Sequence, residues 1–571
     1  TLFMIVILLL NLNLLYLHSM KPPEKSKTPL RKLADLIYLD KGEVFSIYFY
    51  AILSGLVDLS LPVGVQAIIG FVMGATMVTS IYVLIFFVVI GVLSVGIMKI
   101  NQMRIIEKIE QKIFARYAFS FAEKIPNLDL RELDKYYLPE KVNRFFDTIN
   151  VQKGLSKLLL EIPSASIQIL FGLILLSLYH PVFIVFGLVL VAILYCILYL
   201  TSGKGLSSSL EESHYKYRVV AWLEEMAKVI KSFKFSQGTH FNLLKTDSNL
   251  IKYIEARTVH FKVLLFQYKT LVFFKVAITA TMLIVGTNLL LSQELNIGEF
   301  IAAEIVILSV IKAVEKLIVN LDKAYDVLTG IEKLSTITDS PSEIDGNTDL
   351  ISKNGIDILF RNVSFSYQEG TLIFSQFNTH IPPYALVCVS GNEASGKSTF
   401  LKLLSGNYRD FEGSILLNQI PMQNYRLESM RAQTGIYLNQ HEVFEGTVLE
   451  NISLGRTNVT PQQIMNVASQ LGIDDFIHSL AKGFDTLIDT AGKKLSTSLL
   501  KKILLLRAFV NEPSLLLLEE PWNGLDLKVK PIMIDYLKQI AQKTTVVVVS
   551  NDASFGAQCS IRIDLQSGVS N

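Results

Sequence analysis

Nine consecutive residues decide the fold of one half of this chain: Gly391-Asn392-Glu393-Ala394-Ser395-Gly396-Lys397-Ser398-Thr399. They match the pattern G-x-x-x-x-G-K-[ST]. The apolar run before them, residues 385–390, predicts a buried strand, and Phe400–Leu404 continues as a helix. This context predicts a phosphate-binding loop, because glycines let backbone N–H groups approach a phosphate and the helix N-terminus adds partial positive charge. Lys397 is expected to reach the β- and γ-phosphates of a nucleotide, and Ser398 to bind Mg²⁺.

The composition divides the chain into two regions. Half of the 571 residues are hydrophobic, 18% are charged, and the mean hydropathy is +0.41. Long apolar runs fill residues 44–320, whereas residues 350–571 resemble a soluble α/β domain in composition. We therefore predict a transmembrane domain over 20–334, a linker over 335–350 and a nucleotide-binding domain over 351–571.

Charge and cysteine content exclude some function classes. The net charge of +2 gives no reason to expect a nucleic-acid partner. Cys196, Cys388 and Cys559 lie far apart and form no CxxC pair, so they indicate neither a disulfide framework nor a metal site. We interpret all three as small buried hydrophobic residues.

Six apolar runs have about the length that a bilayer requires. The predicted transmembrane helices are residues 46–72, 80–99, 158–178, 182–202, 270–291 and 297–318. The short connectors between them contain no Lys or Arg, whereas the long connectors are basic, so the long ones are predicted to be cytoplasmic. Six crossings keep the N-terminus and the phosphate-binding domain on that side, where ATP is.

The long connectors, residues 100–157 and 203–269, keep helical periodicity. We expect the membrane helices to continue well below the bilayer and to turn near Pro139–Phe146 and Ala221–Lys228. Asp58 and Glu304 are candidate pathway charges because ionisable residues inside a membrane are usually functional. The alternative for Asp58 is a cap at the kink made by Pro62.

The N-terminal region suggests two segments. Residues 27–43 have apolar residues at helical spacing and predict a helix that lies in the membrane interface. Residues 1–19 are apolar but short, and residue 1 is Thr, so we interpret Met20 as the start and 1–19 as translated upstream sequence. An unusual N-terminal anchor is the alternative.

The order of motifs resembles that of the ATP-binding cassette (ABC) family, and the membrane half resembles its six-helix exporters. Phe365-Ser366-Tyr367 is similar to the aromatic loop, which implies that Tyr367 stacks on adenine. Leu438-Asn439-Gln440 is similar to the glutamine loop, which implies that Gln440 approaches Mg²⁺. The resemblance therefore implies ATP and Mg²⁺ as the bound species.

The same resemblance implies catalytic and interface residues. Leu515–Pro521 is similar to the second acidic motif, in which a buried strand carries two carboxylates at its C-terminal end. It implies that Glu519 reaches Mg²⁺ through water and that Glu520 orients the attacking water. Asn523–Asp526 is similar to the loop that crosses the dimer interface, so Asp526 is implied to lie there.

Three positions depart from the family pattern. Glu519 stands where Asp is usual. The signature, usually Leu-Ser-Gly-Gly-Gln, is Leu495-Ser496-Thr497-Ser498-Leu499; Ser496 can donate to the γ-phosphate held by the opposite subunit, but the side chains that replace the glycines hinder close backbone approach. Asn551 replaces the switch histidine and can hydrogen-bond a phosphate but cannot carry charge. We expect nucleotide binding with slow hydrolysis; a cassette that binds ATP only to dimerise is the alternative.

The membrane half is most similar to bacterial exporters of the haemolysin-type (type I) secretion branch. The stretches that carry this similarity are Leu61–Met73, Arg144–Asp147 with Gln152–Leu155, and Trp222–Glu225. The similarity implies a dimeric exporter in the bacterial inner membrane that moves a protein or peptide with a periplasmic membrane-fusion adaptor. Three alternatives stay open: an exporter of lipid or small hydrophobic molecules, an ATP-gated regulatory or assembly component, and a heterodimer whose partner has a regular signature.

Overall fold

The computed structural model describes residues 28–74, 78–133, 137–236, 238–352, 354–367, 372–438, 442–489 and 495–565. The predicted upstream segment 1–19 and Gln440 lie outside these ranges. The chain forms two compact units. A helical unit contains the chain up to Leu128 and Tyr136–Pro341, and a second unit contains Asp129–Lys135 and Ser342–Asn571.

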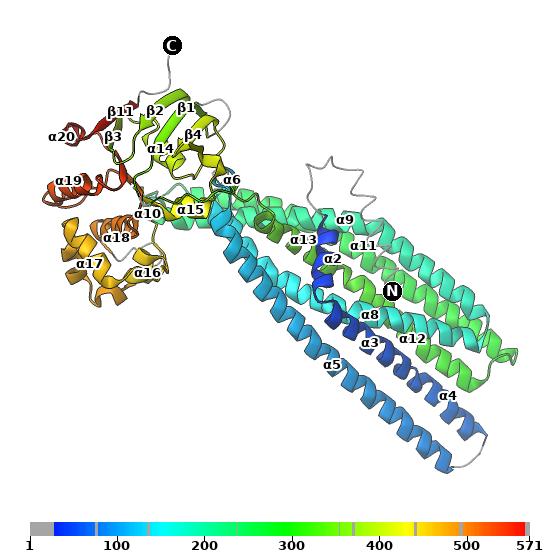
Figure 1. The fold of residues 1–571 in the computed structure, drawn as a ribbon. Coiled ribbons are helices and arrows are strands. Elements are labelled where there is room, and N and C mark those ends of the chain that lie inside the picture. Colours follow the sequence, from blue (N-terminus) through cyan, green and yellow to red (C-terminus); the bar gives the residue numbers. More distant parts are fainter. Residues whose placement is uncertain are drawn as a thin grey trace. The chain divides into compact units, whose positions relative to one another are not determined.

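The helical unit consists of long helices that run side by side (Figure 1). Its described α-helices are α2 (Pro29–Leu39), α3 (Lys41–Asp58), α4 (Ser60–Met73), α5 (Val78–Lys124), α7 (Leu138–Val142), α8 (Asp147–Tyr179), α9 (Val182–Lys228), α10 (Ile230–Phe235), α11 (Phe241–Leu291), α12 (Ile297–Val319) and α13 (Leu321–Thr338). Helix α13 continues through Thr338 into the expected linker.

All six predicted transmembrane segments lie in helices. Five helical stretches among the described residues are long and apolar enough to cross a membrane: those of α3 with α4, of α5, of α8, of α9 and of α11. Helix α12 carries more charge, including Glu304 and Lys312, and about half of its residues are buried against other helices. Its composition is therefore that of a helix inside the bundle rather than one surrounded by lipid.

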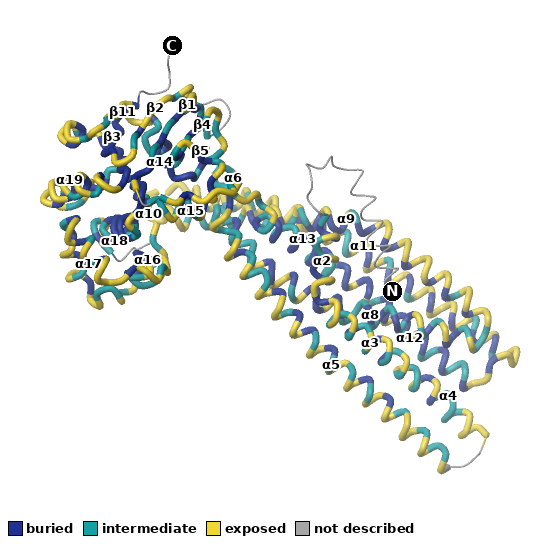
Figure 2. The backbone as a smooth tube through the Cα atoms, viewed as in Figure 1, coloured by how far each residue is buried: buried dark blue, intermediate teal, exposed yellow. Residues whose placement is uncertain are grey.

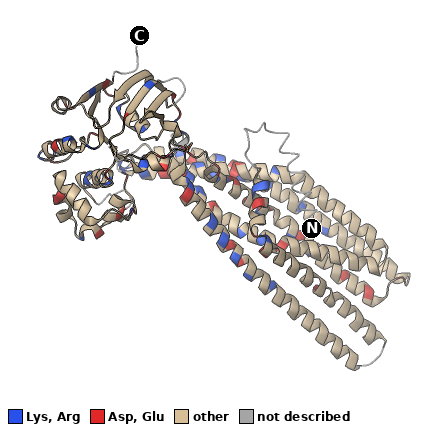
Figure 3. Cartoon of the chain, in the orientation of Figure 1, with Lys and Arg blue, Asp and Glu red and all other residues tan. Residues whose placement is uncertain are grey.

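Much of the surface of these helices is exposed (Figure 2), and many of the exposed side chains are large and apolar. On α5, for example, Phe86, Phe87 and Leu93 are each about 60% exposed. Exposed apolar area of this extent indicates a lipid surrounding. Residues 59–98 contain no charged residue, whereas Lys and Arg follow along the rest of α5 (Figure 3).

The helices continue far beyond one bilayer thickness, as the periodicity predicted. Helices α5 and α9 have 47 residues each and α11 has 51. At about 1.5 Å per residue, each spans about 70 Å, more than twice the hydrocarbon core. Charged residues lie mainly along the second halves of α5 and α9 and along the first half of α11 (Figure 3).

The predicted turn at Ala221–Lys228 is wrong. Helix α9 continues through Lys228, and the chain reverses around the short helix α10 instead. In the first long connector, Asp129–Lys135 belongs to the second unit. Leu130, in α6 (Leu130–Leu133), packs against the core of that unit, and Arg131 forms an ion pair with Asp410.

Local contacts explain three features of the helical unit. Helix α2 is amphipathic, burying Leu30 and Leu36, and Lys32 pairs with Asp339 at 2.8 Å. Asp58 ends α3, and α4 begins two residues later with Pro62 in its first turn. Lys275 pairs with Glu315 of α12.

The second unit contains an antiparallel and a parallel sheet. The antiparallel sheet has the order β2-β1-β4-β5, formed by β1 (Ile358–Phe365), β2 (Phe374–Ile381), β4 (Glu412–Leu417) and β5 (Ile420–Pro421). The parallel sheet has the order β11-β3-β10-β9-β6, formed by β3 (Leu386–Gly391), β6 (Thr434–Tyr437), β9 (Leu515–Glu519), β10 (Thr545–Val549) and β11 (Ile561–Leu565). A further pair consists of β7 (Gly446–Thr447) and β8 (Leu487–Ile488).

Helices cover the parallel sheet (Figure 1). The described α-helices of this unit, besides α6, are α14 (Lys397–Leu404), α15 (Leu427–Ala432), α16 (Val448–Ser453), α17 (Pro461–Gln470), α18 (Thr497–Phe509), α19 (Val529–Ile540) and α20 (Ala553–Gly556). Strands β3, β9 and β10 are buried almost throughout, as expected for parallel strands covered on both faces. Their carboxyl ends meet at one edge, where the predicted site residues gather.

Candidate nucleotide-binding site

The phosphate loop joins β3 to α14, as its sequence predicts. Its backbone enters the left-handed region at Ala394 (φ +59°) and at Gly396 (φ +89°), which precedes the first residue of α14. A Cβ on Gly391 would lie 2.4 Å from the carbonyl oxygen of Leu565, so only glycine fits there. The hydroxyl of Ser395 is buried without a hydrogen-bond partner among the described residues. An unpaired buried donor in this loop fits the phosphate that the sequence predicts.

Lys397 points back across the loop. Its Nζ donates to the carbonyl oxygens of Gly391 at 2.7 Å and Asn392 at 2.5 Å. A phosphate would offer the ammonium a charged acceptor in place of these two neutral ones, and charged acceptors form the stronger hydrogen bonds.

Ser398 and Glu519 form the metal side of the site. Ser398 Oγ donates to Glu519 Oε1, joining the first turn of α14 to the end of β9. A hydroxyl and a carboxylate fit Mg²⁺, which takes one or two protein oxygens and completes its shell with water and nucleotide phosphates. Among the described residues, no group of three or more His, Cys, Asp or Glu could hold a metal by itself. The site therefore suits a metal that arrives with a nucleotide.

Glu520 follows β9 with φ +43°. Its N–H donates to the carbonyl of Val549 on β10 at 2.9 Å. Ser550 Oγ donates to one oxygen of its carboxylate at 3.2 Å, and the N–H of Asn551 donates to the other at 3.3 Å. Both carboxylate oxygens are thus held by the residues that follow β10.

Asn551 contacts the phosphate loop as well as Glu520. Its Oδ1 accepts a hydrogen bond from the N–H of Gly391 at 3.1 Å. The structure thereby brings together Gly391, Glu520 and Asn551 from the ends of β3, β9 and β10. Sequence reasoning placed Asn551 against a phosphate and did not foresee its bond to the loop backbone.

Tyr367 lies beside α14. Its hydroxyl is 3.0 Å from Thr399 Oγ1, and its ring packs edge-on against Phe365 and Tyr408. Lys402 Nζ lies 5.7 Å from the ring centre. The half-buried ring is thus fixed next to the phosphate loop, where an adenine could stack on it.

The segment Leu495–Leu499, which departs from the family signature, forms the N-terminal end of α18. Ser496 is the N-cap, and its Oγ accepts from the N–H of Leu499 at 3.2 Å, which leaves its O–H free to donate to another group. Thr497 and Ser498 lie in the first turn, and Leu499 is buried. Asp526 accepts from the N–H of Lys528 at 3.1 Å. Among the described residues, no hydrogen bond or ion pair joins Ser496 or Asp526 to the phosphate loop.

Sequence reasoning missed three residues near the site. Ser550 holds Glu520, as described above. Tyr437 ends β6; burial, with the charge of Glu519, raises its pKa to about 12, and its hydroxyl has no partner among the described residues. Lys501 is 8% exposed and donates to the carbonyl of Asn523 at 2.8 Å, which ties α18 to the loop that carries Asp526. The only signal in the sequence was that each lies within a few residues of a recognised motif.

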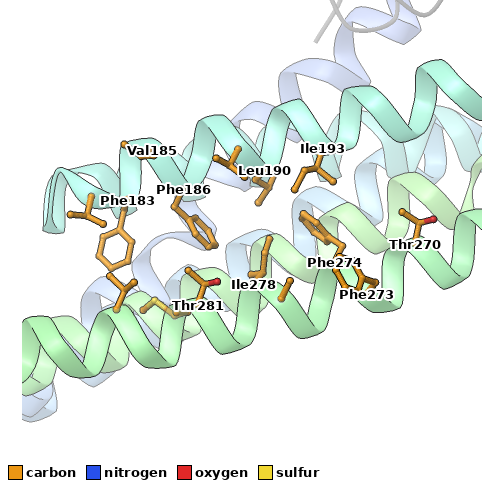
Figure 4. A pocket seen from close by; sticks show the side chains of 15 residues that line it. Phe183, Val185, Phe186, Leu190, Ile193, Thr270, Phe273, Phe274, Ile278 and Thr281 are labelled. Atoms are coloured by element: carbon orange, nitrogen blue, oxygen red, sulfur yellow. The ribbon is translucent and has the colours of Figure 1, made fainter.

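A separate hollow lies in the helical unit between α9 and α11. It has a volume of about 460 Å³. Figure 4 shows Phe183, Phe186 and Leu190 of α9 and Phe274 and Ile278 of α11 around it. The remaining lining residues are Val182, Val185, Val189, Ile193, Thr270, Phe273, Ala277, Thr281, Met282 and Val285. Apart from the two threonines the lining is apolar, so the hollow suits a hydrophobic guest.

Comparison with known proteins agrees with this fold. Residues 374–523 match the family model of the ABC transporter domain. The chain is 28% identical over 270 residues to the alpha-hemolysin translocation ATP-binding protein HlyB of Escherichia coli O157:H7, which covers 47% of this chain and 38% of the relative. It is 28% identical over 272 residues to the leukotoxin export ATP-binding protein LtxB of Aggregatibacter actinomycetemcomitans, with the same shares covered. The matched region thus spans well under half the length of these relatives.

A solved structure of a bacterial Atm1-family ABC exporter with ATP bound superposes with a TM-score of 0.79. The match covers 93% of this chain and 94% of that one at 18% identity, and it confirms the predicted fold class. The chain is therefore a multi-pass membrane protein with the ABC exporter fold, in which a helical membrane domain is fused to an ABC transporter ATPase domain.

Proposed function

We propose that the protein is an ATP-driven exporter that works as a dimer and moves a protein or peptide across the bacterial inner membrane. The observation that carries the proposal is the meeting of Lys397, Glu519 and Glu520 at one edge of a parallel sheet, in a chain that also contains a membrane bundle. The likeness to translocation and export proteins such as HlyB and LtxB supports the cargo class and suggests a periplasmic adaptor.

Each site residue has a role in this proposal. The backbone of Gly391–Thr399 and Lys397 bind the phosphates of ATP, and Tyr367 stacks on its adenine. Ser398 and Glu519, with Gln440, hold Mg²⁺, which supplies charge neutralisation on the phosphate oxygens when bound. Glu520, whose carboxylate Ser550 and Asn551 hold in place, orients the attacking water.

The proposed dimer is supported by two predicted site residues that lie apart from the phosphate loop of their own chain. Ser496 and Asp526 are exposed. An exposed O–H at the start of α18 suits the γ-phosphate of ATP held by a second copy, so two copies would form two composite sites. A homodimer would carry Thr497, Ser498 and Asn551 in both sites, and its turnover would be slow; a heterodimer with a regular partner chain would have one fast site.

The test is the ATPase rate of the purified protein in lipid, beside Lys397→Ala and Glu520→Gln. We expect measurable turnover that falls by about 10²–10³-fold in both variants, because each removes a group that acts on the transition state. Glu520→Gln should keep nucleotide affinity, whereas Lys397→Ala should lose it. Bound nucleotide without turnover above the variants would contradict a self-sufficient exporter and favour the ATP-gated component or a heterodimer.

The hollow between α9 and α11 favours a second candidate function, export of a lipid or small hydrophobic molecule. An exporter of this kind would need no adaptor, and hydrophobic compounds would stimulate its ATPase. Filling the hollow with Ile278→Trp should abolish that stimulation. Leu283→Trp, on an exposed face of the same helix, is the matched control and should leave it unchanged.

A further inference from the structure

One lysine of the second unit is buried, although lysine usually keeps its charged end in water. Lys501 lies in the second turn of α18 and is 8% exposed. Its Nζ donates to the carbonyl oxygen of Asn523 at 2.8 Å. Because burying a charged group is unfavourable unless it is hydrogen-bonded, this contact accounts for the inward position of the side chain. The contact joins α18 to the loop that follows β9.

Gly524 shows how closely the lysine packs against this loop. Gly524 has φ +74°, and a Cβ there would lie 3.3 Å from Nζ, 3.9 Å from Cε and 4.0 Å from Cδ of Lys501. The two longer distances are ordinary van der Waals contacts, whereas the first would require the amine to move. A glycine at this position therefore leaves room for the amine beside the carbonyl of Asn523.

Asn523 closes a turn that begins at Glu520, whose carboxylate is proposed to orient the attacking water. The N–H of Asn523 donates to the carbonyl oxygen of Glu520 at 3.2 Å. Pro521 occupies the second position of this turn, which its fixed φ favours. The N–H of Asn523 thus holds Glu520, and the carbonyl of the same residue is held by Lys501.

Glu520 needs support on both sides because its backbone is strained. Its φ of +43° is in the left-handed region, which a residue with a side chain occupies only when its surroundings hold it there. Before Glu520, the support is the hydrogen bond from its N–H to Val549; after it, the support is the turn closed by Asn523. If the turn relaxed, Glu520 would leave the left-handed region and its carboxylate would move away from Ser550 and Asn551.

We propose that Lys501 is a positioning residue for ATP hydrolysis. By holding the carbonyl of Asn523, it keeps the turn after β9 closed and the carboxylate of Glu520 in place. The effect on turnover rests on the proposed function; the effect on the turn does not.

The first test is Lys501→Met in the full chain in lipid, which keeps an unbranched apolar stem and removes the donor. We expect kcat for ATP to fall about tenfold, since a displacement of about 1 Å at a reacting group can cost up to about 100-fold. KM and the affinity for ATP should not change, because the phosphate loop is untouched. Asn523 is exposed, so water can bind its carbonyl in the variant and the temperature of unfolding should change little. Lys501→Arg, which keeps a charged donor, should recover part of the turnover.

Lys502→Met is the matched control at the next residue. Lys502 Nζ pairs with Asp475 at 2.6 Å, and the side chain of Asp475 is 77% exposed. Surface ion pairs of this kind contribute little, so this variant should keep the turnover of the wild type.

Gly524→Ala tests the same contact from the side of the loop. Its Cβ would displace Nζ of Lys501 but would meet a methionine at that position only at van der Waals distance. Gly524→Ala should therefore lower turnover about threefold in the wild type and cause no further loss in the Lys501→Met variant. Gly455→Ala is the control for backbone strain: its φ is +77°, no atom of the described residues lies within 4 Å of the new Cβ, and turnover should be unchanged.

Trp522 reports on the turn without any turnover. The chain has two tryptophans, so in a Trp222→Phe background the fluorescence comes from Trp522 alone. Trp522 is 7% exposed, and its ring packs against Phe555 with the centroids 4.9 Å apart. Lys501→Met should raise the quenching of this fluorescence by acrylamide, and Lys502→Met should leave it unchanged.

The outcomes separate the two parts of the proposal. Unchanged quenching in Lys501→Met would overturn the hold on the turn, and raised quenching with unchanged kcat would overturn the positioning role. Equal losses of ATP affinity and turnover, or the same losses in Lys502→Met, would leave Lys501 a merely structural role. If the wild type has no turnover above Lys397→Ala, the proposed function fails and the effect on turnover with it, while the fluorescence of Trp522 still decides whether Lys501 holds the turn.

Discussion

The phosphate loop and the segment Leu495–Leu499 both end at a helix N-terminus, yet their polar groups are arranged differently. Before α14, the backbone is left-handed at Gly396, the Ser395 hydroxyl has no hydrogen-bond partner in the described part of the chain, and Lys397 lies across the loop. Before α18, Ser496 caps its own helix and the next two residues carry side chains.

This difference indicates that ATP affinity and the rate of ATP hydrolysis depend on different helices. The start of α14 keeps donors available for a ligand, whereas the start of α18 uses much of its hydrogen-bonding capacity for its own stability. We therefore expect ATP to bind well through the first helix, and the rate of hydrolysis to be limited by the second together with Asn551.

The largest effect is expected from Gly391→Ala, which places a methyl group inside the phosphate loop. The new Cβ would lie 2.4 Å from a backbone oxygen and 2.5 Å from Ser395 Oγ. We expect ATP affinity to fall at least about 100-fold, or about 2.8 kcal/mol, measured by nucleotide binding to the full chain.

The matched control for this variant is Gly455→Ala. Gly455 also has a positive φ, +77°, but no atom of the described residues lies within 4 Å of a Cβ there. It should lower stability by about 1–2 kcal/mol through backbone strain and leave ATP affinity unchanged. Equal losses of affinity in both variants would mean that strain in the unit, and not the shape of the loop, decides binding.

Asn551→His tests whether the missing charge at the switch position limits turnover. A histidine at this position can carry the positive charge that Asn551 lacks, and charge placed near a developing phosphate charge stabilises the transition state. We expect turnover to rise about tenfold with nucleotide affinity unchanged, in a steady-state ATPase assay.

Asn551→Ala is the opposite change at the same position. It removes the acceptor for the N–H of Gly391 and should lower turnover below that of the wild type. A histidine variant no faster than the alanine variant would show that the switch position does not limit hydrolysis and would direct attention to Leu495–Leu499.

The two roles of Ser496 can be separated by substitution. Ser496→Ala removes both the cap and the O–H donor, and should lower the stability of the second unit by about 1 kcal/mol as well as its turnover. Ser496→Asp keeps a capping oxygen but has no proton to donate at neutral pH, so stability should survive while turnover falls about tenfold. Thermal unfolding and ATPase, measured on the same samples, decide this; full turnover in the aspartate variant would refute a donor role for Ser496.

Local patterns predicted much of the second unit, and long-range contacts were beyond their reach. The strand, loop and helix around Gly391–Thr399 follow from adjacent residues, so the sequence sufficed there. The contact of Asn551 with Gly391 joins residues 160 positions apart and exists only because β10 lies next to β3. The cysteines show the same limit: Cys388 is buried as the sequence predicts, whereas Cys559 is half-buried and Cys196 is exposed.

The helical unit shows a different limit. Apolar length predicted six membrane segments, and five of the helical stretches that contain them are long and apolar enough to cross a membrane; the sixth, α12, carries Glu304 and Lys312 and is not among the five. The position of the turn after α9 was missed because helical periodicity does not mark where a helix ends. Val229 follows Lys228 with φ −109° and ψ 32°, and no glycine or proline announces this break.

The smallest effect concerns the anchor of the switch segment. Lys530 Nζ pairs with Asp552, the residue after Asn551, and its hydrogen bond is the main cause that lowers the pKa of Asp552. A lowered folded-state pKa contributes stability that is present above the ordinary aspartate pKa of about 4 and is lost as the pH falls below it. Lys530→Met should therefore lower stability at neutral pH and reduce the loss of stability on acidification. Because both side chains are partly exposed, the expected loss at neutral pH is only about 0.5–1 kcal/mol.

Lys538→Met is the control on the same helix, since Asp535, its partner at 3.5 Å, is 78% exposed; it should change neither quantity. Urea unfolding at pH 7 and pH 4 measures both effects, and an unchanged pH dependence in Lys530→Met would show that Lys530 does not anchor the residues that hold Glu520.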